Sequence, residues 1–420
     1  MKAELSRRDL VKYGVAGTFG AAGVGSLWLG WRGESSDGAV AIFEHDAPQG
    51  ELWAAWQARG WVKEARHYRE LGKNLQCQVC PNECLLGPED RSHCRNKVHK
   101  DGKIYTLAYG NPASVHIDPI EKKPLFHFLP SSPAFSIATS GCSFRCLNCQ
   151  NWELSQKRPE DLKVVEGPEL RLTLANAEAL GRVDIDRASL FPEAVVDFAR
   201  ATGCASIAYT YAEPTSFYEY MLDTARAART AGVRNVWVTN GYIRRQALEE
   251  LAEELDAANV DLKSFSAATY QKLNGGQLQP VLETLKTLRE AGVWVEVTNL
   301  MVPTYTDDPD ETRRMCEWLV EHLGPDVPLH LSCFYPKYKL EHLPATPPGV
   351  LVEAKRIAHE AGLHFVYLGN VRGIPEAQTT LCPGCGKAVV RRTGYNVLDR
   401  EVSRDGKCGH CGGRVAGVWG

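Results

Sequence analysis

Three cysteines that lie close together in the sequence could hold a metal cluster. They are Cys142, Cys146 and Cys149, in a loop that follows an expected β-strand at 135–139. Three thiolates at these spacings can bind three irons of a four-iron cluster and leave the fourth iron open for substrate chemistry. A structural zinc ion would need a fourth protein ligand, and the nearest candidate is His127. The pattern therefore favours an iron–sulfur cluster with one open iron.

Two cysteine pairs near the C-terminus form a second set. Each pair has two residues between its cysteines, and the members of the set are Cys382, Cys385, Cys408 and Cys411. Glycines beside the pairs allow the tight turns that direct backbone N–H groups at sulfur. Four thiolates in this arrangement suit a tetrahedral zinc ion or a single iron, and zinc is the favoured metal. A disulfide pair is the remaining alternative.

A third set precedes the others in the chain and has four cysteines. Its members are Cys77, Cys80, Cys84 and Cys94. Four cysteine ligands serve zinc and an auxiliary iron–sulfur cluster equally well, so both remain open. A cluster would indicate electron transfer or substrate binding, whereas zinc would stabilise the local fold. The cysteines outside the three sets are expected to be small core residues, and they are Cys204, Cys316 and Cys333.

The composition is that of an ordinary globular protein. The chain has 420 residues, of which 44% are hydrophobic and 24% are charged, values that support a large core and argue against intrinsic disorder. Its 48 Lys and Arg against 51 Asp and Glu give a formal net charge of -3. This balance excludes a strongly basic nucleic-acid-binding protein, so no nucleic acid partner is expected.

Strands and helices are expected to alternate between residues 105 and 375. Four times a helical pattern ends in a small residue and a glycine, and a β-rich run follows, at 206–211, 235–239, 293–302 and 364–368. Further strands are expected at 135–139, 259–263 and 328–334. Leu248, Leu251 and Leu255 fall on one face of an intervening helix. The alternation predicts a parallel sheet, open or closed into a full or partial barrel, with ligands at the carboxyl ends of its strands.

The N-terminal segment has the layout of a twin-arginine export leader. Arg7 and Arg8 precede a segment at 13–31 that carries no charge and is rich in Gly and Ala. The leader could be cleaved at 39–41 or could remain as an anchor. Four parts are predicted: the leader and tail at 1–45, a helical lead-in and four-cysteine module at 46–104, the core at 105–375, and a second four-cysteine module at 376–420.

Several motifs together resemble a known enzyme family. The first cysteine set matches the Cys-x3-Cys-x2-Cys signature of radical S-adenosylmethionine (SAM) enzymes. Residues 73–420 more closely resemble the AmmeMemoRadiSam-system radical SAM enzymes, which are relatives of the pyruvate formate-lyase activating enzymes. This closer resemblance rests on the terminal cysteine pairs and on the segments 120–125 (IEKKPL), 127–128 (HF), 149–151 (CQN), 209–215 (YTYAEPT), 239–241 (TNG), 261–263 (DLK) and 368–370 (LGN).

The resemblance implies a fold and an activity. The implied fold is α/β, a radical SAM (β/α)6-type partial barrel with an N-terminal cysteine-rich module and a C-terminal zinc-ribbon-like module. The implied cofactors are a [4Fe-4S] cluster on Cys142, Cys146 and Cys149, SAM, and zinc. The expected reaction is reductive cleavage of SAM to a 5′-deoxyadenosyl radical, which abstracts a hydrogen atom from a substrate. The relation to glycyl-radical activators suggests a protein or peptide substrate, with a small molecule as the alternative.

By the same resemblance, polar residues at successive strand ends bind SAM. Glu213 would accept hydrogen bonds from the SAM amino group. Asn240, Asp261 and Lys263 would meet the methionyl and ribose parts, with Lys263 paired to the SAM carboxylate. Each position also has a purely structural alternative, because Glu213 could begin a helix and Asn240 could belong to a turn. Asp261 and Lys263 could form an ordinary surface ion pair.

Three features depart from the family pattern. Activating enzymes commonly have an acidic residue where this chain has Val238, so one SAM contact is missing. Close relatives often have a histidine where Tyr335 follows Phe334. The segment 158–190 is longer than the pattern requires, and a polar surface loop is the default expectation for such an insertion.

Partners and location follow from the resemblance and the leader. The expected partners are a reductant such as a flavodoxin or ferredoxin and, by family resemblance, Memo-type and AMMECR-type proteins. The leader favours export or membrane anchoring, whereas SAM chemistry favours the cytoplasm. Two rival classes remain: a non-catalytic iron–sulfur or zinc scaffold or electron carrier, and a thiol oxidoreductase that uses the Cys-x2-Cys pairs. The oxidoreductase ranks last because thioredoxin-like sequence context is missing around those pairs.

Overall fold

The computed structural model describes residues 40–163 and 190–420, and these residues belong to one compact unit. Nearly all of the predicted leader and most of the predicted insertion at 158–190 lie outside the described residues. The twin-arginine signal and the location of the protein therefore stay predictions. Within the described ranges, none of the helices combines the length and the apolarity that a bilayer span requires.

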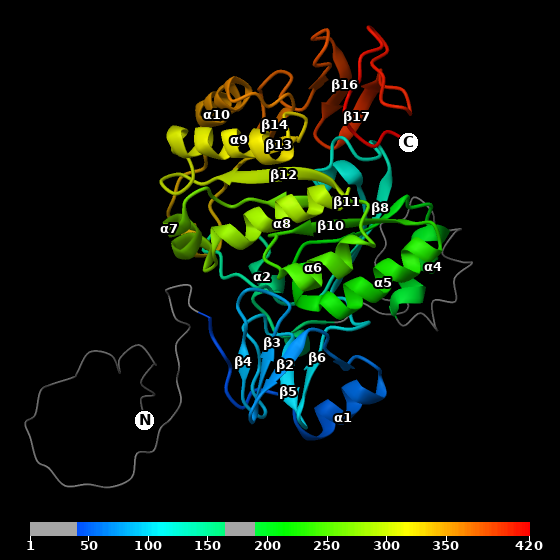
Figure 1. The fold of residues 1–420 in the computed structure, drawn as a ribbon, viewed down its shortest axis with the longest axis vertical. Coiled ribbons are helices and arrows are strands. Elements are labelled where there is room, and N and C mark those ends of the chain that lie inside the picture. The colour runs from blue at the N-terminus through cyan, green and yellow to red at the C-terminus, as the bar shows by residue number, and fades with distance from the viewer. Residues whose placement is uncertain (1–39, 164–189) are drawn as a thin grey trace, which may run out of the picture. The chain divides into compact units, whose positions relative to one another are not determined.

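A sheet of eight strands forms the centre of the fold (Figure 1). Its spatial order is β14-β13-β12-β11-β10-β9-β8-β7, and the run from β8 to β14 is parallel, while β7 pairs with β8 antiparallel. The strands are β7 (Ser114–Pro119), β8 (Pro133–Ala138), β9 (Ser206–Tyr209), β10 (Arg234–Thr239), β11 (Ala257–Asp261), β12 (Trp294–Met301), β13 (Leu329–Cys333) and β14 (Val366–Gly369). All seven strands expected from the sequence are present, and the antiparallel edge strand β7 is an addition to them. Because β7 and β14 pair with only one neighbour each, the sheet is open.

Among the described residues, six helices of eight or more residues connect the parallel strands, one in each connection, as a repeat of six strand–helix units requires. They are α4 (Pro192–Ala201), α5 (Tyr218–Thr230), α6 (Arg245–Ala252), α8 (Leu278–Glu290), α9 (Pro309–Leu323) and α10 (Pro348–Glu360). The glycines expected after the helices end them as predicted; Gly232, for example, has a φ of 74°, which favours a residue without a Cβ atom. Figure 1 shows α5, α6 and α8 lying along one face of the sheet.

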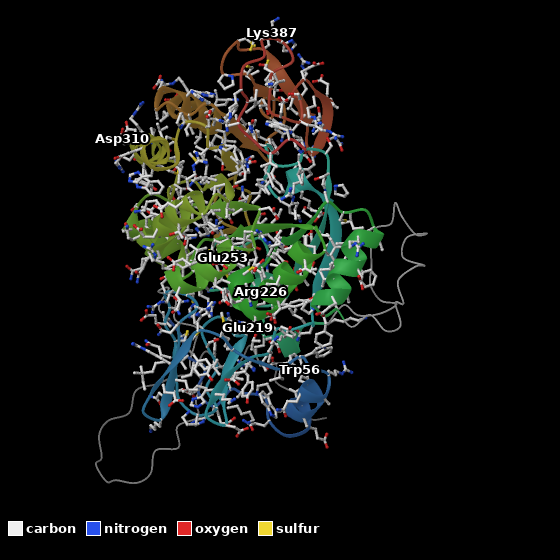
Figure 2. The ribbon with its side chains drawn as sticks, turned by 45° about the vertical axis from the view of Figure 1, so that its right-hand side comes forward. Trp56, Glu219, Arg226, Glu253, Asp310 and Lys387 are labelled. Atoms are coloured by element: carbon white, nitrogen blue, oxygen red, sulfur yellow. The ribbon has the colours of Figure 1, made fainter. Side chains whose placement is uncertain are left out.

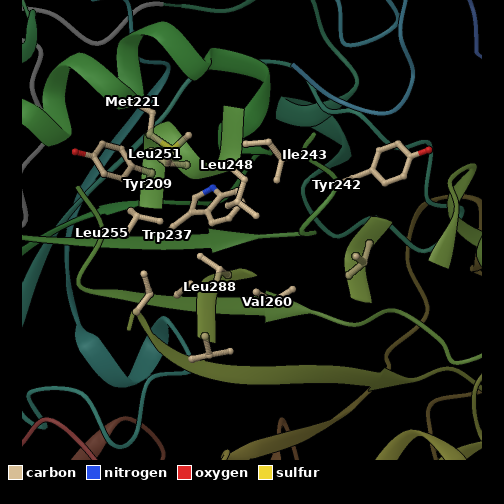
Figure 3. Close-up of a cluster of buried hydrophobic side chains, with 14 of the residues drawn as sticks. Tyr209, Met221, Trp237, Tyr242, Ile243, Leu248, Leu251, Leu255, Val260 and Leu288 are labelled. Carbon is tan, nitrogen blue, oxygen red and sulfur yellow. The ribbon is translucent and has the colours of Figure 1, made fainter. Parts of the chain in front are cut away.

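The main hydrophobic core lies between these helices and the sheet. Trp237 on β10 is fully buried, and Figure 3 shows it beside Leu248 and Leu251 of α6 and Tyr209 of β9. Leu255 is buried in the same cluster but lies beyond the end of α6, so the predicted helix face is confirmed for Leu248 and Leu251, and the helix is shorter than the leucine spacing predicted. This packing fixes β9 and β10 against their helices and thereby fixes the loops that leave the ends of these strands.

The N-terminal module consists mainly of short strands. A helix, α1 (Gly50–Ala58), is followed by two three-stranded antiparallel sheets. Their strands are β1 (Lys63–Glu64), β2 (Tyr68–Leu71), β3 (Asn74–Cys77), β4 (Leu85–Leu86), β5 (Lys97–Lys100) and β6 (Lys103–Thr106). The helical lead-in predicted from residue 46 is therefore helical only over α1, because the segment after it pairs with more distant strands of the module.

The C-terminal module is a three-stranded antiparallel sheet in the order β15-β16-β17. Its strands are β15 (Thr380–Leu381), β16 (Ala388–Thr393) and β17 (Asn396–Arg400). Arg392 of β16 joins the module to the segment between β7 and β8, because its guanidinium donates to the carbonyl of Phe126 at 2.6 Å. The same guanidinium donates to Thr380 Oγ1 within the module at 2.8 Å.

The core position of Leu251 gives a test of this packing. Leu251→Ala should lower the free energy of unfolding by about 2–5 kcal/mol, because the truncated side chain leaves a cavity in a fully buried cluster. Urea unfolding followed by circular dichroism measures the loss. Leu52→Ala on α1, where the side chain is 43% exposed, is the matched control and should change stability by about 0.5 kcal/mol or less. Equal losses in the two variants would contradict the assignment of the core.

Candidate metal centres

The loop after β8 carries Cys142, Cys146 and Cys149 and ends at the short helix α2 (Trp152–Ser155). Backbone bonds from a π-helical turn, η7 (Tyr270–Asn274), hold this loop in place. The Arg145 N–H donates to the carbonyl of Asn274 at 2.8 Å, and the Leu147 N–H donates to the carbonyl of Leu273 at 2.9 Å. The loop therefore lies at the carboxyl ends of the strands, where the sequence predicted ligand binding.

Polar side chains surround the three thiols of this loop. The Asn274 amide donates to Cys146 Sγ at 3.2 Å, and Ser155 Oγ lies 3.2 Å from Cys149 Sγ. Burial raises the pKa of Cys142 well above its usual value, and the Glu213 carboxylate acts in the same direction. Burial also raises the pKa of Cys146 to about 11, although Lys263 opposes the shift. Thiolates here would need a bound cation, so an all-cysteine donor set for iron fits the site.

Glu213 lies at the end of the β9 loop with its carboxylate buried. Its Oε1 accepts hydrogen bonds from Thr215 N at 3.0 Å, Thr215 Oγ1 at 2.7 Å and Thr239 Oγ1 at 2.8 Å, and its Oε2 accepts from Asn240 N at 2.8 Å. Burial raises its pKa, and the N–H groups of Asn240 and Thr215 oppose that shift. Glu213 therefore joins the ends of β9 and β10, and Oε2 keeps room for one further donor.

Asn240 lies directly beside the cysteine loop. Its side-chain amide donates to Ser143 Oγ at 3.0 Å and lies 3.8 Å from Cys142 Sγ, while its Oδ1 accepts from Tyr242 N at 2.9 Å. The turn that the sequence offered as an alternative is thus present, and the side chain also contacts the loop. A structural role and a role in the site coexist at this position.

Asp261 and Lys263 form an ion pair at the end of β11. Lys263 Nζ lies 2.6 Å from Asp261 Oδ2, and both side chains are partly shielded from solvent. Burial would lower the pKa of Lys263, but the Asp261 carboxylate and the Cys146 thiol outweigh it and raise that pKa. The four residues predicted to bind SAM thus lie around Cys142 and Cys146, and their binding of SAM stays a prediction.

Several site residues had no signal in the sequence. Asn274 and Ser155 contact thiols from positions outside the cysteine motif, and Ser143, which lies within that motif, accepts a hydrogen bond from Asn240 that the motif does not predict. Asn274 Oδ1 is buried and finds no hydrogen-bond partner among residues 40–163 and 190–420. It is one polar atom at the site that a bound donor group would satisfy.

His127, the nearest candidate for a fourth zinc ligand, is engaged elsewhere. Its Nδ1 lies 2.6 Å from the carbonyl of Ala416, and its Nε2 lies 2.5 Å from the hydroxyl of Tyr367. Burial lowers its pKa to about 4, against the opposing effect of Glu296, so the ring is neutral near pH 7. Both ring nitrogens are used in joining the C-terminal module to the sheet, which leaves none for zinc at the cysteine loop.

The C-terminal cysteines lie close enough to hold one ion. Their four sulfurs lie within 4.8 Å of one another, with 3.7 Å between Cys382 and Cys411 and 3.8 Å between Cys385 and Cys408. Zinc bonds to sulfur of about 2.3 Å in a tetrahedron place the sulfurs about 3.8 Å apart. The backbone N–H groups of His410 and Gly413 also point at sulfurs of this set. The geometry therefore suits a tetrahedral metal ion.

The N-terminal cysteines have a different arrangement. All four line one small cavity, together with Lys97, Ser143 and Thr215. Within the described part of the chain, however, the C-terminal set is the only group of three or more candidate side chains close enough to share one ion. All 14 cysteines of the chain are described, and each is a free thiol, so the disulfide alternative is not observed.

Comparison with known proteins agrees with this geometry. A family model for the radical SAM superfamily matches residues 136–319, which run from β8 into α9. Uncharacterized protein MJ0808 of Methanocaldococcus jannaschii is 40% identical over 359 residues, which are 84% of this chain and 99% of that protein. The chain belongs to the radical SAM superfamily. Membership implies SAM and an iron–sulfur cluster as cofactors.

A curated activating enzyme and a solved structure match smaller parts of the chain. The pyruvate formate-lyase 1-activating enzyme of Escherichia coli is 32% identical over 102 residues, which are 24% of this chain and 42% of that enzyme. The crystal structure of Streptococcus suis SuiB bound to S-adenosylmethionine is 12% identical, with a TM-score of 0.40, over 63% of this chain and 55% of SuiB. The chain is thus related to activating enzymes over 24% of its length.

The close contact between Gly276 and Phe144 gives a test of the packing that keeps the cysteine loop in position. A Cβ atom at Gly276 would clash with the ring of Phe144, so Gly276→Ala should cost about 1–3 kcal/mol and displace the loop. Thermal unfolding measures the loss of stability. Gly349→Ala is the control, because a Cβ atom there meets no atom within 4 Å. A Gly276→Ala variant as stable as the control would contradict the packing of Phe144.

Proposed function

We propose that this protein binds a [4Fe-4S] cluster through Cys142, Cys146 and Cys149 and uses it to cleave SAM reductively for hydrogen-atom abstraction from a substrate. The observation that carries the proposal is the gathering of these thiols with Glu213 and Lys263 at the carboxyl ends of the strands. When bound, the cluster supplies the electron that breaks a C–S bond of SAM and releases a 5′-deoxyadenosyl radical.

The side chains around the cluster loop have separate parts in holding SAM. The Oε2 atom of Glu213 accepts a hydrogen bond from the SAM ammonium group. The described residues supply this atom with one donor, Asn240 N, and a carboxylate oxygen can accept a second. Lys263 pairs with the SAM carboxylate, and the Asp261 carboxylate holds the ammonium group of Lys263 in place. Asn240, between Ser143 and Cys142, keeps the loop aligned with the end of β10.

The proposed substrate is a protein or a peptide. Support comes from the name of the pyruvate formate-lyase 1-activating enzyme, which states action on another protein, and from its relation to this chain. The proposed electron donor is a flavodoxin or a ferredoxin. The narrower AmmeMemoRadiSam assignment, with Memo-type and AMMECR-type partners, is proposed on the sequence motifs alone.

The C-terminal module is proposed to be a zinc ribbon. The sulfur separations of 3.7 and 3.8 Å support zinc at Cys382, Cys385, Cys408 and Cys411. Although burial of the thiol acts in the opposite direction, the N–H groups of Cys411 and His410 lower the pKa of Cys408 to about 6, which favours the thiolate that zinc requires.

An anaerobic assay tests the proposed reaction. With SAM and dithionite, the reconstituted protein should form 5′-deoxyadenosine, and Cys146→Ala should reduce production to the level of a blank because one iron loses its ligand. Liquid chromatography with mass spectrometry measures the product. Cys204→Ala, which removes a buried thiol outside the three cysteine sets, should leave production unchanged. An intact cluster that yields no 5′-deoxyadenosine would instead favour the scaffold or electron-carrier alternative.

Metal analysis tests the proposed zinc ribbon. The double variant Cys382→Ala, Cys411→Ala should lose about one zinc per chain relative to the wild-type protein, because two of the four ligands are gone. Inductively coupled plasma mass spectrometry measures the zinc content, and the double variant Cys204→Ala, Cys316→Ala serves as the control. Unchanged zinc, or iron lost in its place, would contradict the zinc assignment.

A further inference from the structure

The loop that carries Cys94 packs directly on the loop that carries Cys142. The carbonyl oxygen of Cys94 lies so close to Gly141 that a Cβ atom there would clash with it. The side-chain amide of Asn96 also donates to the carbonyl of Ser140 at 2.7 Å, and its Oδ1 accepts from Ser140 Oγ at 2.9 Å. The backbones of the two cysteine loops are therefore in contact, immediately before Cys142.

Side chains from each loop complete the hydrogen bonds of the other. The Arg145 guanidinium donates to the carbonyl of Cys142 at 3.1 Å and also to the carbonyl of His93, the residue before Cys94. The side-chain amide of Asn82 donates to the carbonyl of Ser143 at 2.8 Å. Residues of the N-terminal module thus take part in the hydrogen bonds that hold the radical SAM loop.

The sulfur arrangement of the N-terminal set argues against one shared ion. Zinc would draw four sulfurs to about 3.8 Å from one another, as in the C-terminal set. Among the described residues, neither the N-terminal set nor the three cysteines of the radical SAM loop comes together in this way. The N-terminal thiols instead line a common cavity. An iron–sulfur cluster suits this wider arrangement, because each cysteine binds a different iron.

A buried ion pair also lies beside the cavity. Lys97, which lines the cavity, is fully buried, and its Nζ lies 2.6 Å from each carboxylate oxygen of Glu219 on α5. Figure 2 labels Glu219 where α5 meets the strands of the N-terminal module. Hydrogen-bond donors reach the sulfurs as well: His93 N lies 3.4 Å from Cys84 Sγ, and Ser92 Oγ lies 3.1 Å from Cys94 Sγ. Such bonds stabilise cluster-bound thiolates.

We infer that Cys77, Cys80, Cys84 and Cys94 bind a second four-iron cluster in contact with the radical SAM loop. Because a cysteine is present for every iron, no iron stays open for substrate, and the site serves electron transfer. One electron from a reduced flavodoxin or ferredoxin would enter at this site and pass to the proposed cluster at Cys142, so the carrier would be oxidised by one electron, the cluster at Cys142 would be reduced by one, and no bond would form or break in this transfer. This relay rests on the proposed function, whereas the metal assignment does not.

The metal assignment is tested with the full chain after its radical SAM cluster has been removed. The triple variant Cys142→Ala, Cys146→Ala, Cys149→Ala is reconstituted anaerobically, and iron, acid-labile sulfide and zinc are measured together with the electron paramagnetic resonance spectrum after reduction. About four irons and four sulfides per chain should remain, against about eight of each in the wild-type protein. The triple variant Cys204→Ala, Cys316→Ala, Cys333→Ala, which leaves all three cysteine sets intact, should keep about eight.

Loss of all iron and sulfide from the first triple variant, or a second zinc per chain in it, would overturn the assignment. Because this variant leaves the N-terminal cysteines unchanged, a failure of SAM cleavage in the wild-type protein does not affect the result. For the relay, Cys80→Ala, Cys84→Ala should lose flavodoxin-driven formation of 5′-deoxyadenosine and keep the dithionite-driven reaction, since the small reductant reaches the SAM site directly. No loss, or equal loss with both reductants, would overturn the relay.

Discussion

The need to compensate buried thiolates shapes the carboxyl end of this sheet. The three cysteines of the loop after β8 lie there, the carbonyl of Cys94 packs against Gly141 in this loop, and burial raises the pKa of Cys142 and Cys146. Amide and hydroxyl groups surround the sulfurs, and the cations Arg145 and Lys263 lie beside them. Buried thiolates in such surroundings would require a bound cation, so metal binding at the proposed site and correct folding of this region would depend on each other.

The strands bring the polar groups of this site together, although few of these groups belong to a strand themselves. The core around Trp237 fixes β9 and β10 against their helices, and Glu213 then joins the ends of the two strands through hydrogen bonds. Because parallel strands end at the same edge of the sheet, short loops suffice to bring Asn240 and Lys263 to the cysteines. The contacts of Glu213 with Thr239 and Asn240 make it part of the architecture as well as of the proposed SAM site.

The sequence predicted the parts of this fold that are local in character. Glycines after helices and β-rich runs located the parallel strands, and cysteine spacing located the metal sets. It did not predict the short strands after α1 or the edge strand β7, since their pairing depends on distant segments. Asn274 and the packing of Cys94 against Gly141 were missed for the same reason: each joins residues far apart in the chain that share no motif.

The three cysteine sets divide between the two ends of the sheet. The C-terminal module is joined to the early residues of β12 and β14, because His127 links Ala416 to Tyr367 and its backbone N–H donates to Glu296. Arg392 adds a bond from β16 to Phe126, so the proposed zinc site would stabilise the end of the sheet opposite the reactive loops. The N-terminal set lies instead at the reactive end. It is in contact with the loop that carries Cys142, and only one helix and a few strands separate the two in the sequence. Position in the fold, rather than the number of cysteines, therefore separates the proposed stabilising metal site from the sites proposed to take part in the chemistry.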